Sequence, residues 1–292
     1  MSFISNLISG LSLGSIYALI ALGYTMVYGI AKMLNFAHGD VIMVGAFTVF
    51  TAAATLKFPP AIAIIVGILV CTIIGVLIEK VAYKPLRKAS PLTVLITAIG
   101  VSYFLQSLAL LIFGSNQKSF PKLITFQPIK ITENLVVKGE SLLTMGITIA
   151  IMIALTLFIN KTKTGRAMLT VSEDKGAAEL MGVNVNKTIS VTFAIGSALA
   201  AVAGLFFGLT YGFIGPYTGA MPGIKAFVAA VLGGIGSIPG AMLGGIMLGV
   251  IENLSKAYIS TELSDAIVFG VLIIVLLVKP TGLLGKKTNE KV

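Results

Sequence analysis

Three side chains that can hydrogen bond lie close together in the stretch Asn35-Phe36-Ala37-His38-Gly39-Asp40, just before an apolar segment. An amide, an imidazole and a carboxylate at this spacing could contact a polar solute. Asp40 or Asn35 could instead cap the helix that the apolar segment predicts. Both interpretations stay open for this polar turn, which we expect at a membrane boundary: a helix cap with an interfacial histidine, or a re-entrant turn formed by Asn35, His38, Gly39 and Asp40 that lines a pathway or orders a gate.

Two acidic residues, Glu79 and Glu252, stand at the ends of apolar segments. We interpret them as interfacial charges or partners in ion pairs, with a role in gating as the alternative. They do not resemble a proton relay, because such a relay needs acids in the middle of membrane segments.

A second candidate site lies in the loop 160–188, where the stretch 173–182 predicts a short helix. Acidic residues suit the positive start of a helix and glycine suits its end. We expect a small apolar face made of Ala177, Ala178 and Met181, which would fit a groove on a partner; a solvated surface helix is the alternative. The residues of this candidate site are Glu173, Asp174, Ala177, Ala178, Glu179, Leu180, Met181 and Gly182.

A third candidate is the bend 233–240, which combines glycine with proline. Glycine is flexible and proline lacks a backbone donor, so Gly234, Gly236 and Pro239 interrupt a helix there. The flanking apolar runs, 223–234 and 240–251, are each too short to span a bilayer, and they predict a broken or re-entrant hairpin. Such backbone is tolerated in a membrane only when protein covers it or it lines a cavity, so we place these three residues on the same pathway or gate.

Several kinds of chemistry are absent from the sequence. There is no phosphate-binding G-x-x-x-x-G-K-[ST] loop, so we do not expect the chain to hydrolyse ATP. One histidine and one cysteine cannot form a zinc site. The chain is therefore predicted not to be an enzyme and to bind no metal or cofactor of its own.

The elements that carry these residues are membrane helices. The chain has 292 residues, of which 57% are hydrophobic and only 11% are charged, whereas soluble domains carry about 25% charged residues. We predict an all-α integral membrane protein, a single domain over residues 1–292, with a polytopic bundle of about 8–9 membrane segments. The expected segments are 5–28, 41–56, 61–83, 92–113, 141–159, 189–213, 223–234, 240–251 and 266–279.

Lysine and arginine cluster in the loops 79–91 and 160–188 and in the C-terminal tail. Because cytoplasmic loops carry an excess of these residues, we place all three inside, with the N-terminus outside. The loop 114–140 then falls outside although it carries four lysines, a conflict softened by its two glutamates.

The two ends of the chain also resemble each other. An ordered series, from Tyr28-Gly29-Ile30 through Pro60 to Glu79, recurs from Tyr211-Gly212-Phe213 through Pro239 to Glu252. With halves at about 5–113 and 189–279, the copies would run in opposite directions, as in an inverted repeat whose interface holds the substrate path. Chance matching among common apolar residues is the alternative.

Two motifs carry a family resemblance. The stretch 34–40 followed by Met43-Val44-Gly45-Ala46, and the stretch Thr164-Gly165-Arg166-Ala167 through Gly182, resemble the permeases of branched-chain amino-acid ATP-binding-cassette (ABC) transporters. The resemblance covers nearly the whole chain and is nearest to the smaller of the two permeases in such systems. Permeases for urea and short amides look similar, so the substrate is less well specified.

The resemblance implies an assembly and a location. It implies a second related permease, two cytoplasmic subunits that bind and hydrolyse ATP, and an extracytoplasmic binding protein, in the plasma membrane of a bacterium or archaeon with the C-terminus cytoplasmic. The stretch 173–182 would be the helix that couples the ATPases to the membrane. An ion-coupled secondary transporter is the alternative class.

Overall fold

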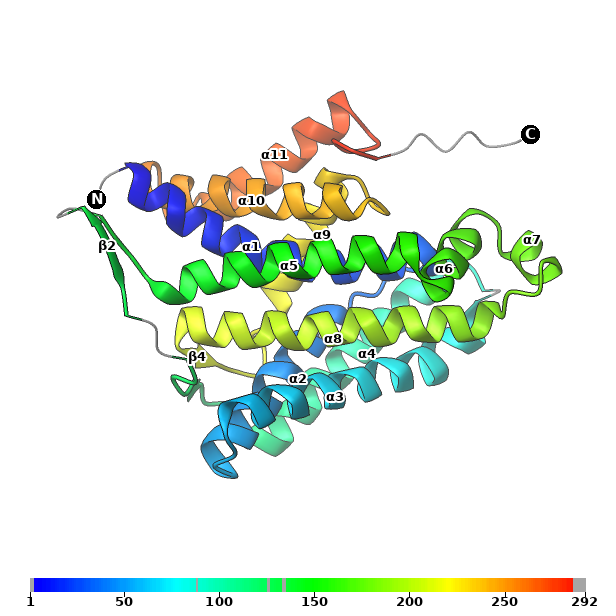
Figure 1. The fold of residues 1–292 in the computed structure, drawn as a ribbon, viewed down its shortest axis with the longest axis horizontal. Coiled ribbons are helices and arrows are strands. Elements are labelled where there is room, and N and C mark those ends of the chain that lie inside the picture. The colour runs from blue at the N-terminus through cyan, green and yellow to red at the C-terminus, as the bar shows by residue number, and fades with distance from the viewer. Residues whose placement is uncertain (1–2, 88, 125–126, 133–134, 286–292) are drawn as a thin grey trace.

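The computed structural model describes residues 3–87, 89–124, 127–132 and 135–285, and it is built almost entirely of helices that lie side by side (Figure 1). The apolar helices are α1 (Phe3–Ala31), α2 (His38–Phe50), α3 (Pro60–Ile78), α4 (Pro91–Phe113), α5 (Gly139–Lys161), α8 (Val185–Tyr211), α9 (Ala220–Gly233), α10 (Ile238–Tyr258) and α11 (Ser264–Val278). Within the described ranges, seven helical stretches are long and apolar enough to cross a membrane, while α9 and α11 are shorter. The prediction of a polytopic helical membrane protein is confirmed.

Short elements join these helices at their ends. They are the π-helical turns η1 (Thr51–Thr55) and η2 (Glu79–Tyr83), the 3-10 turn η3 (Lys84–Leu86), and the helices α6 (Lys163–Glu173) and α7 (Lys175–Leu180). Four strands form two antiparallel pairs, β1 (Lys118–Ser119) with β4 (Phe213–Ile214), and β2 (Ile129–Thr132) with β3 (Leu135–Val137). In Figure 1 the strands lie at one end of the helices, and α6 and α7 lie at the other.

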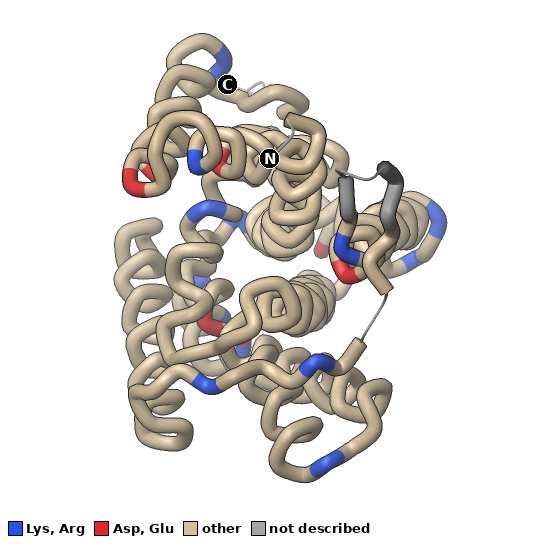
Figure 2. Tube along the Cα trace, turned by 90° about the vertical axis from the view of Figure 1, so that its left-hand side faces the viewer, with Lys and Arg blue, Asp and Glu red and all other residues tan. Residues whose placement is uncertain are grey.

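The helices form two groups, which are also visible end-on in Figure 2. In what we call the first bundle, α1 packs against α9 and α10, and α11 packs against α9 and α10. In the second bundle, α8 packs against α2 and α3, and α4 packs against α2. The bundles meet mainly where α1 contacts α8 and α2 contacts α9, with α5 lying against α1, α8 and α10.

The main contacts in one bundle have counterparts in the other. The pair α1 and α10 corresponds to α8 and α3, and the pair α9 and α10 corresponds to α2 and α3. In Figure 1, α3 runs from the end with the strands toward the other end, and α10 runs the opposite way. This is the pattern of contacts that an inverted repeat predicts, with each bundle drawing its helices from both halves of the chain.

Glycine allows the central helices to approach closely. A Cβ atom at Gly14 would lie 2.7 Å from the backbone of Ile246, and one at Gly10 would lie 2.9 Å from that of Val250, so α1 and α10 touch through their backbones. Small residues at four-residue spacing permit this kind of contact between membrane helices. Gly245 and Gly249 of α10 likewise meet Ala18 and Gly14 of α1.

The helix α10 corrects one expectation. The apolar run was expected to end at residue 251, too short to span, but α10 continues to Tyr258 and has 21 residues. The extension carries Glu252 and Lys256, which pair with each other, and Glu252 also pairs with Lys225 of α9. Of the expected re-entrant hairpin, only α9 is short, with 14 residues.

Candidate functional site

The two bundles meet at a crossing made of glycine backbone. A Cβ atom at Gly39 of α2 would lie 2.5 Å from the carbonyl oxygen of Gly219 and 3.2 Å from the Cα of Gly223, both next to or within α9. Any side chain at these positions would push α2 and α9 apart. We call Gly39, Gly219 and Gly223 the glycine crossing.

His38, the first residue of α2, lies beside the glycine crossing. Its ring packs against the backbone of Gly23 on α1 and lies 4.7 Å from the ring of Tyr24, centroid to centroid. The residue is only 1% exposed, and its Nε2 has no hydrogen-bond partner among the described residues, while the ring is hydrogen bonded to the carbonyl of Ile20. A buried polar atom without a partner costs about 1–3 kcal/mol, and Nε2 therefore keeps unused hydrogen-bonding capacity at the junction of the two bundles.

The depth of His38 differs from the expectation of a membrane boundary. Its neighbour Gly23 lies eight residues before the end of α1, about 12 Å at 1.5 Å per residue. Gly196, which faces Gly23 from α8, lies eleven residues from the start of that helix, about 16 Å. His38 therefore lies about 12–16 Å inward from these two helix ends, a distance that corresponds to roughly half of a hydrocarbon core of about 30 Å.

The other polar residues of the turn hold the second bundle together. The Tyr83 hydroxyl donates to Oδ1 of Asn35 at 2.9 Å, and Nε2 of Gln106 on α4 donates to Oδ1 of Asp40 at 2.9 Å. The capping interpretation is wrong, because Ala37 is the N-cap of α2 and no side chain caps that helix. Asn35 and Asp40 are instead buried cross-links beside the junction.

The interpretation of Glu79 and Glu252 as ion-pair partners is confirmed, and both are buried. Glu79, at one end of the molecule, accepts from Arg87 and from Ser190 of α8, whose hydroxyl lies 2.6 Å away. Arg87 also donates to Asn186 on α8. Glu79 thus joins α3 to α8 within the second bundle.

Glu252 does the same within the first bundle, near the opposite end. Its carboxylate accepts from the Tyr17 hydroxyl of α1 at 2.8 Å and pairs with Lys225 of α9 at 2.8 Å and Lys256 of α10 at 2.5 Å. Lys225 also pairs with Asp265 of α11 at 2.7 Å. Four helices therefore meet at one cluster of charges.

Lys225 was missed by the sequence reasoning, although a signal was present. It is the single charged residue of α9 and lies in the apolar run 223–234. An ionisable residue within a membrane segment is expensive to bury and usually faces the interior of the bundle with a partner. Its acidic partners, far away in sequence, could not be identified from spacing.

The loop 160–188 contains two helices, α6 and α7, rather than one. The expected roles of two residues are confirmed: the Asp174 side chain caps α7 by accepting from the Ala177 amide at 3.0 Å, and Gly182, just after the helix, has a left-handed φ of 80°. Glu173 belongs to the end of α6. The helix itself is shorter than expected, Lys175–Leu180.

The expected apolar face of this helix is wrong in one important residue. Ala178 is fully buried against the chain itself, whereas Leu180 is 91% exposed and Met181 is 81% exposed. The α7 helix turns Ala178 inward because Lys175, at the start of α7, donates from Nζ to the carbonyl of Ala31 at 2.8 Å and holds it against α1. We call Leu180 and Met181 the exposed tip (α7 in Figure 1); the exposed residues Glu173, Asp174, Ala177, Glu179 and Gly182 surround it.

The structure does not bring the bend at 234–239 together with the polar turn. Gly234 and Gly236 have left-handed φ values of 102° and 94°, and Pro239 lies in the first turn of α10. Gly236 faces Gly29, six residues beyond Gly23 along α1. The C-terminal segment also packs here, since the Leu284 amide donates to the carbonyl of Gly233.

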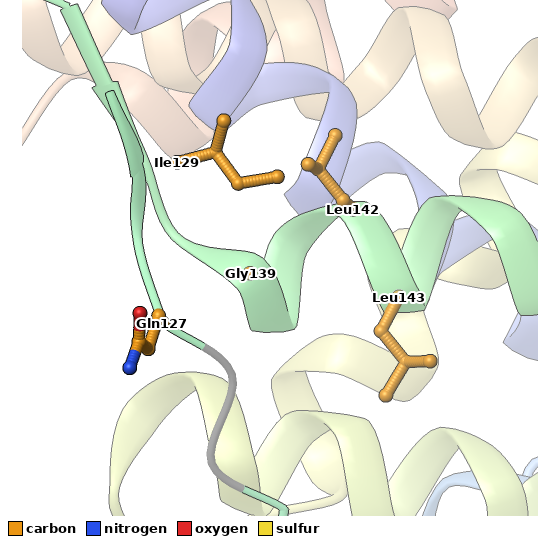
Figure 3. Close-up of a pocket in the computed structure, with 5 residues that line it drawn as sticks. All are labelled: Gln127, Ile129, Gly139, Leu142 and Leu143. Atoms are coloured by element: carbon orange, nitrogen blue, oxygen red, sulfur yellow. The ribbon is translucent and has the colours of Figure 1, made fainter. Parts of the chain in front are cut away.

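Two surface cavities do not coincide with the polar turn. One of about 210 Å³ lies beside β2 and the start of α5, and Figure 3 shows Ile129 and Leu142 side by side at its edge. The other, of about 200 Å³, is an apolar groove between α2 and α4 near Phe47 and Phe113. Neither includes His38 or a charged residue, and the junction at His38 is closed in this conformation.

Comparison with known proteins gives a consistent result. Residues 6–276 match the model of a family described as the permease component of branched-chain amino acid transport systems. The high-affinity branched-chain amino acid transport system permease protein LivH of Salmonella typhimurium is 48% identical, with 99% of this chain and 98% of that protein covered. The corresponding protein of Escherichia coli is 47% identical over the same shares, and BraD of Pseudomonas aeruginosa is 45% identical over 99% and 98%.

Proposed function

The chain belongs to the family of permease components of branched-chain amino acid transport systems, and on that premise we propose that it forms one half of the membrane pathway of an ABC importer for leucine, isoleucine and valine. The family match, which covers nearly the whole chain, is the observation that carries this proposal. The relatives at 45–48% identity are described as permeases of high-affinity branched-chain amino acid transport systems.

We propose that the pathway passes the junction of the two bundles beside His38. The junction lies at mid-depth, where inverted-repeat transporters hold their substrates. Three features support this position: the unpaired Nε2 of His38, the glycine crossing that can open without displacing side chains, and nearby aromatic rings such as Phe227, 5.8 Å from Tyr24. Asn35 and Asp40 position the turn, and Gly234, Gly236 and Pro239 form a second flexible point nearer the end with α7.

We further propose the partners and orientation that such an importer needs. The exposed tip of α7 fits an apolar groove on a cytoplasmic ATPase, which places α6, α7 and the C-terminus in the cytoplasm of a bacterial or archaeal cell. A second related permease completes the pathway, and a binding protein delivers substrate at the end with the strands. ATP is bound by the partner subunits, and this chain carries no cofactor and no catalytic residue.

The test is uptake of labelled leucine by liposomes that contain this chain with its permease, ATPase and binding-protein partners. Uptake that requires ATP and is inhibited by unlabelled isoleucine and valine is expected. Uptake that persists without ATP and stops when the proton gradient is collapsed would support an ion-coupled transporter instead. Inhibition by urea or acetamide, but not by isoleucine, would move the substrate to the urea and amide class.

A further inference from the structure

The helix α9 contacts both bundles, so its attachment decides where the junction opens. At its start the glycine crossing places it against α2 of the second bundle. Along its length it packs against α1, α10 and α11 of the first bundle. When the bundles separate during transport, α9 must stay with one of them and leave the other.

The contacts on the two sides of α9 differ in kind. Toward α2 they include close backbone contacts between glycines, and no ion pair joins α9 to α2 among the described residues. Toward the first bundle, Lys225 makes ion pairs with Glu252 of α10 at 2.8 Å and with Asp265 of α11 at 2.7 Å. Removing one member of a buried ion pair leaves an uncompensated charge, which is strongly unfavourable, so α9 separates more readily from α2.

Lys225 is well placed to hold α9 against the first bundle. Its side chain is 7% exposed, and Glu252 is held in turn by the Tyr17 hydroxyl of α1. Every helix of the first bundle therefore contributes at least one group to the cluster. The neighbouring Lys256 also pairs with Glu252, but it lies on the same helix four residues away and joins no second helix.

We infer that Lys225 is a positioning residue for transport, which fixes α9 to the first bundle so that the pathway opens at the glycine crossing beside His38. This inference rests on the proposed function, because it assumes that the two bundles move relative to each other. Without the ion pairs of Lys225, α9 would divide its contacts between both bundles. The junction would then open incompletely although the ATPases still dock and hydrolyse ATP.

The test combines distance measurements with transport in the full complex, with Cys71 and the partners' cysteines replaced by serine. Spin labels at Met221 of α9 and Leu243 of α10 report distances within the first bundle, and labels at Met221 and Ile62 of α3 report distances between bundles; all three side chains are exposed. We expect that ATP changes the Met221–Ile62 distance and leaves the Met221–Leu243 distance unchanged.

In Lys225→Met the Met221–Leu243 distribution should broaden, and leucine uptake per ATP hydrolysed should fall at least tenfold, with the ATPases still bound. Lys225→Arg should recover part of the uptake, and Lys256→Met should stay within twofold of wild type. Asp265→Asn, which breaks only the pair with α11, provides a milder variant if Lys225→Met does not assemble. An unchanged Met221–Leu243 distribution in Lys225→Met or Asp265→Asn, or equal uptake in Lys225→Met and Lys256→Met, would overturn the inference. Failure of the wild-type complex to transport leucine would instead contradict the proposed function.

Discussion

Truncating the exposed tip of α7 should release the ATPase subunits while leaving the permease folded. The change is the double substitution Leu180→Ala and Met181→Ala. Both side chains are almost fully exposed in this chain, at 91% and 81%, so nearly all of their apolar surface is available to a partner. Neither has a contact within the fold that would make the substitution destabilising.

The magnitude follows from the area that docking would bury. Full burial of a leucine or methionine side chain contributes roughly 1.5–3 kcal/mol. Taking about 1.5 kcal/mol for each, because alanine retains part of the contact, the double variant loses about 3 kcal/mol of binding free energy. Since each 1.4 kcal/mol is a factor of ten, the affinity for the ATPase should fall about 100-fold.

The assay is purification of the complex through a tag on this subunit, followed by titration of the ATPase onto the purified permeases. Leu169→Ala is the matched control, because Leu169 is 43% exposed on α6 but lies away from the tip. The buried Ala178 is unsuitable for this test: an arginine there would place a charge in the chain's own core at a cost of several kcal/mol. Wild-type affinity in the double variant would refute the docking of the tip.

Three further predictions test orientation, the pathway and electrostatics. In a Cys71→Ser background, a cysteine at the exposed Asn184 should resist an impermeant thiol reagent in intact cells, while one at the exposed Glu262 should react; labelling of Asn184→Cys would reverse the orientation. His38→Ala should lower leucine uptake at least tenfold with normal amounts of assembled complex, and unchanged uptake would remove His38 from the pathway. Burial, with Arg87 and Lys32 nearby, holds the pKa of Lys175 below its usual range. Between the pKa of Lys175 in the folded chain and its higher pKa in the unfolded chain, the unfolded chain binds more protons, so the free energy of unfolding should rise as pH increases through that window. Lys175→Met should flatten this alkaline rise, measured by thermal unfolding in detergent. The same pH profile in Lys175→Met and wild type would contradict this prediction.

Most helix positions could be predicted from hydropathy, because helices such as α3 and α4 are predominantly apolar and their starts are marked by proline at residues 60 and 91. The end of α10 could not, because Glu252 and Lys256 look like the start of a loop until the partner of Glu252 on α9 is known. A hydropathy average over a stretch of sequence counts a charged residue as polar, even where an ion pair in the folded protein neutralises its charge.

The candidate residues were found more reliably than their surroundings. The polar turn was identified from its composition, but its depth depends on where α2 begins relative to α1 and α8, which is set by glycine contacts between distant segments. The inward orientation of Ala178 likewise depends on the link between Lys175 and Ala31, which are 144 residues apart. Spacing along one helix gives its faces, but not which face the rest of the chain covers.

The exchange of helices between the two bundles has a consequence for biosynthesis. The second bundle takes α2, α3 and α4 from the first half of the chain and is complete once α8 has left the ribosome. The first bundle requires α1, which is made first, together with α9, α10 and α11, which are made last. The face of α1 that carries Gly10 and Gly14 therefore remains without its partner α10 while more than 200 residues are synthesised. A chain cut short after α8 would leave a finished second bundle and an α1 that lies against α5 and α8 but exposes the glycine face that α10 covers in the complete chain.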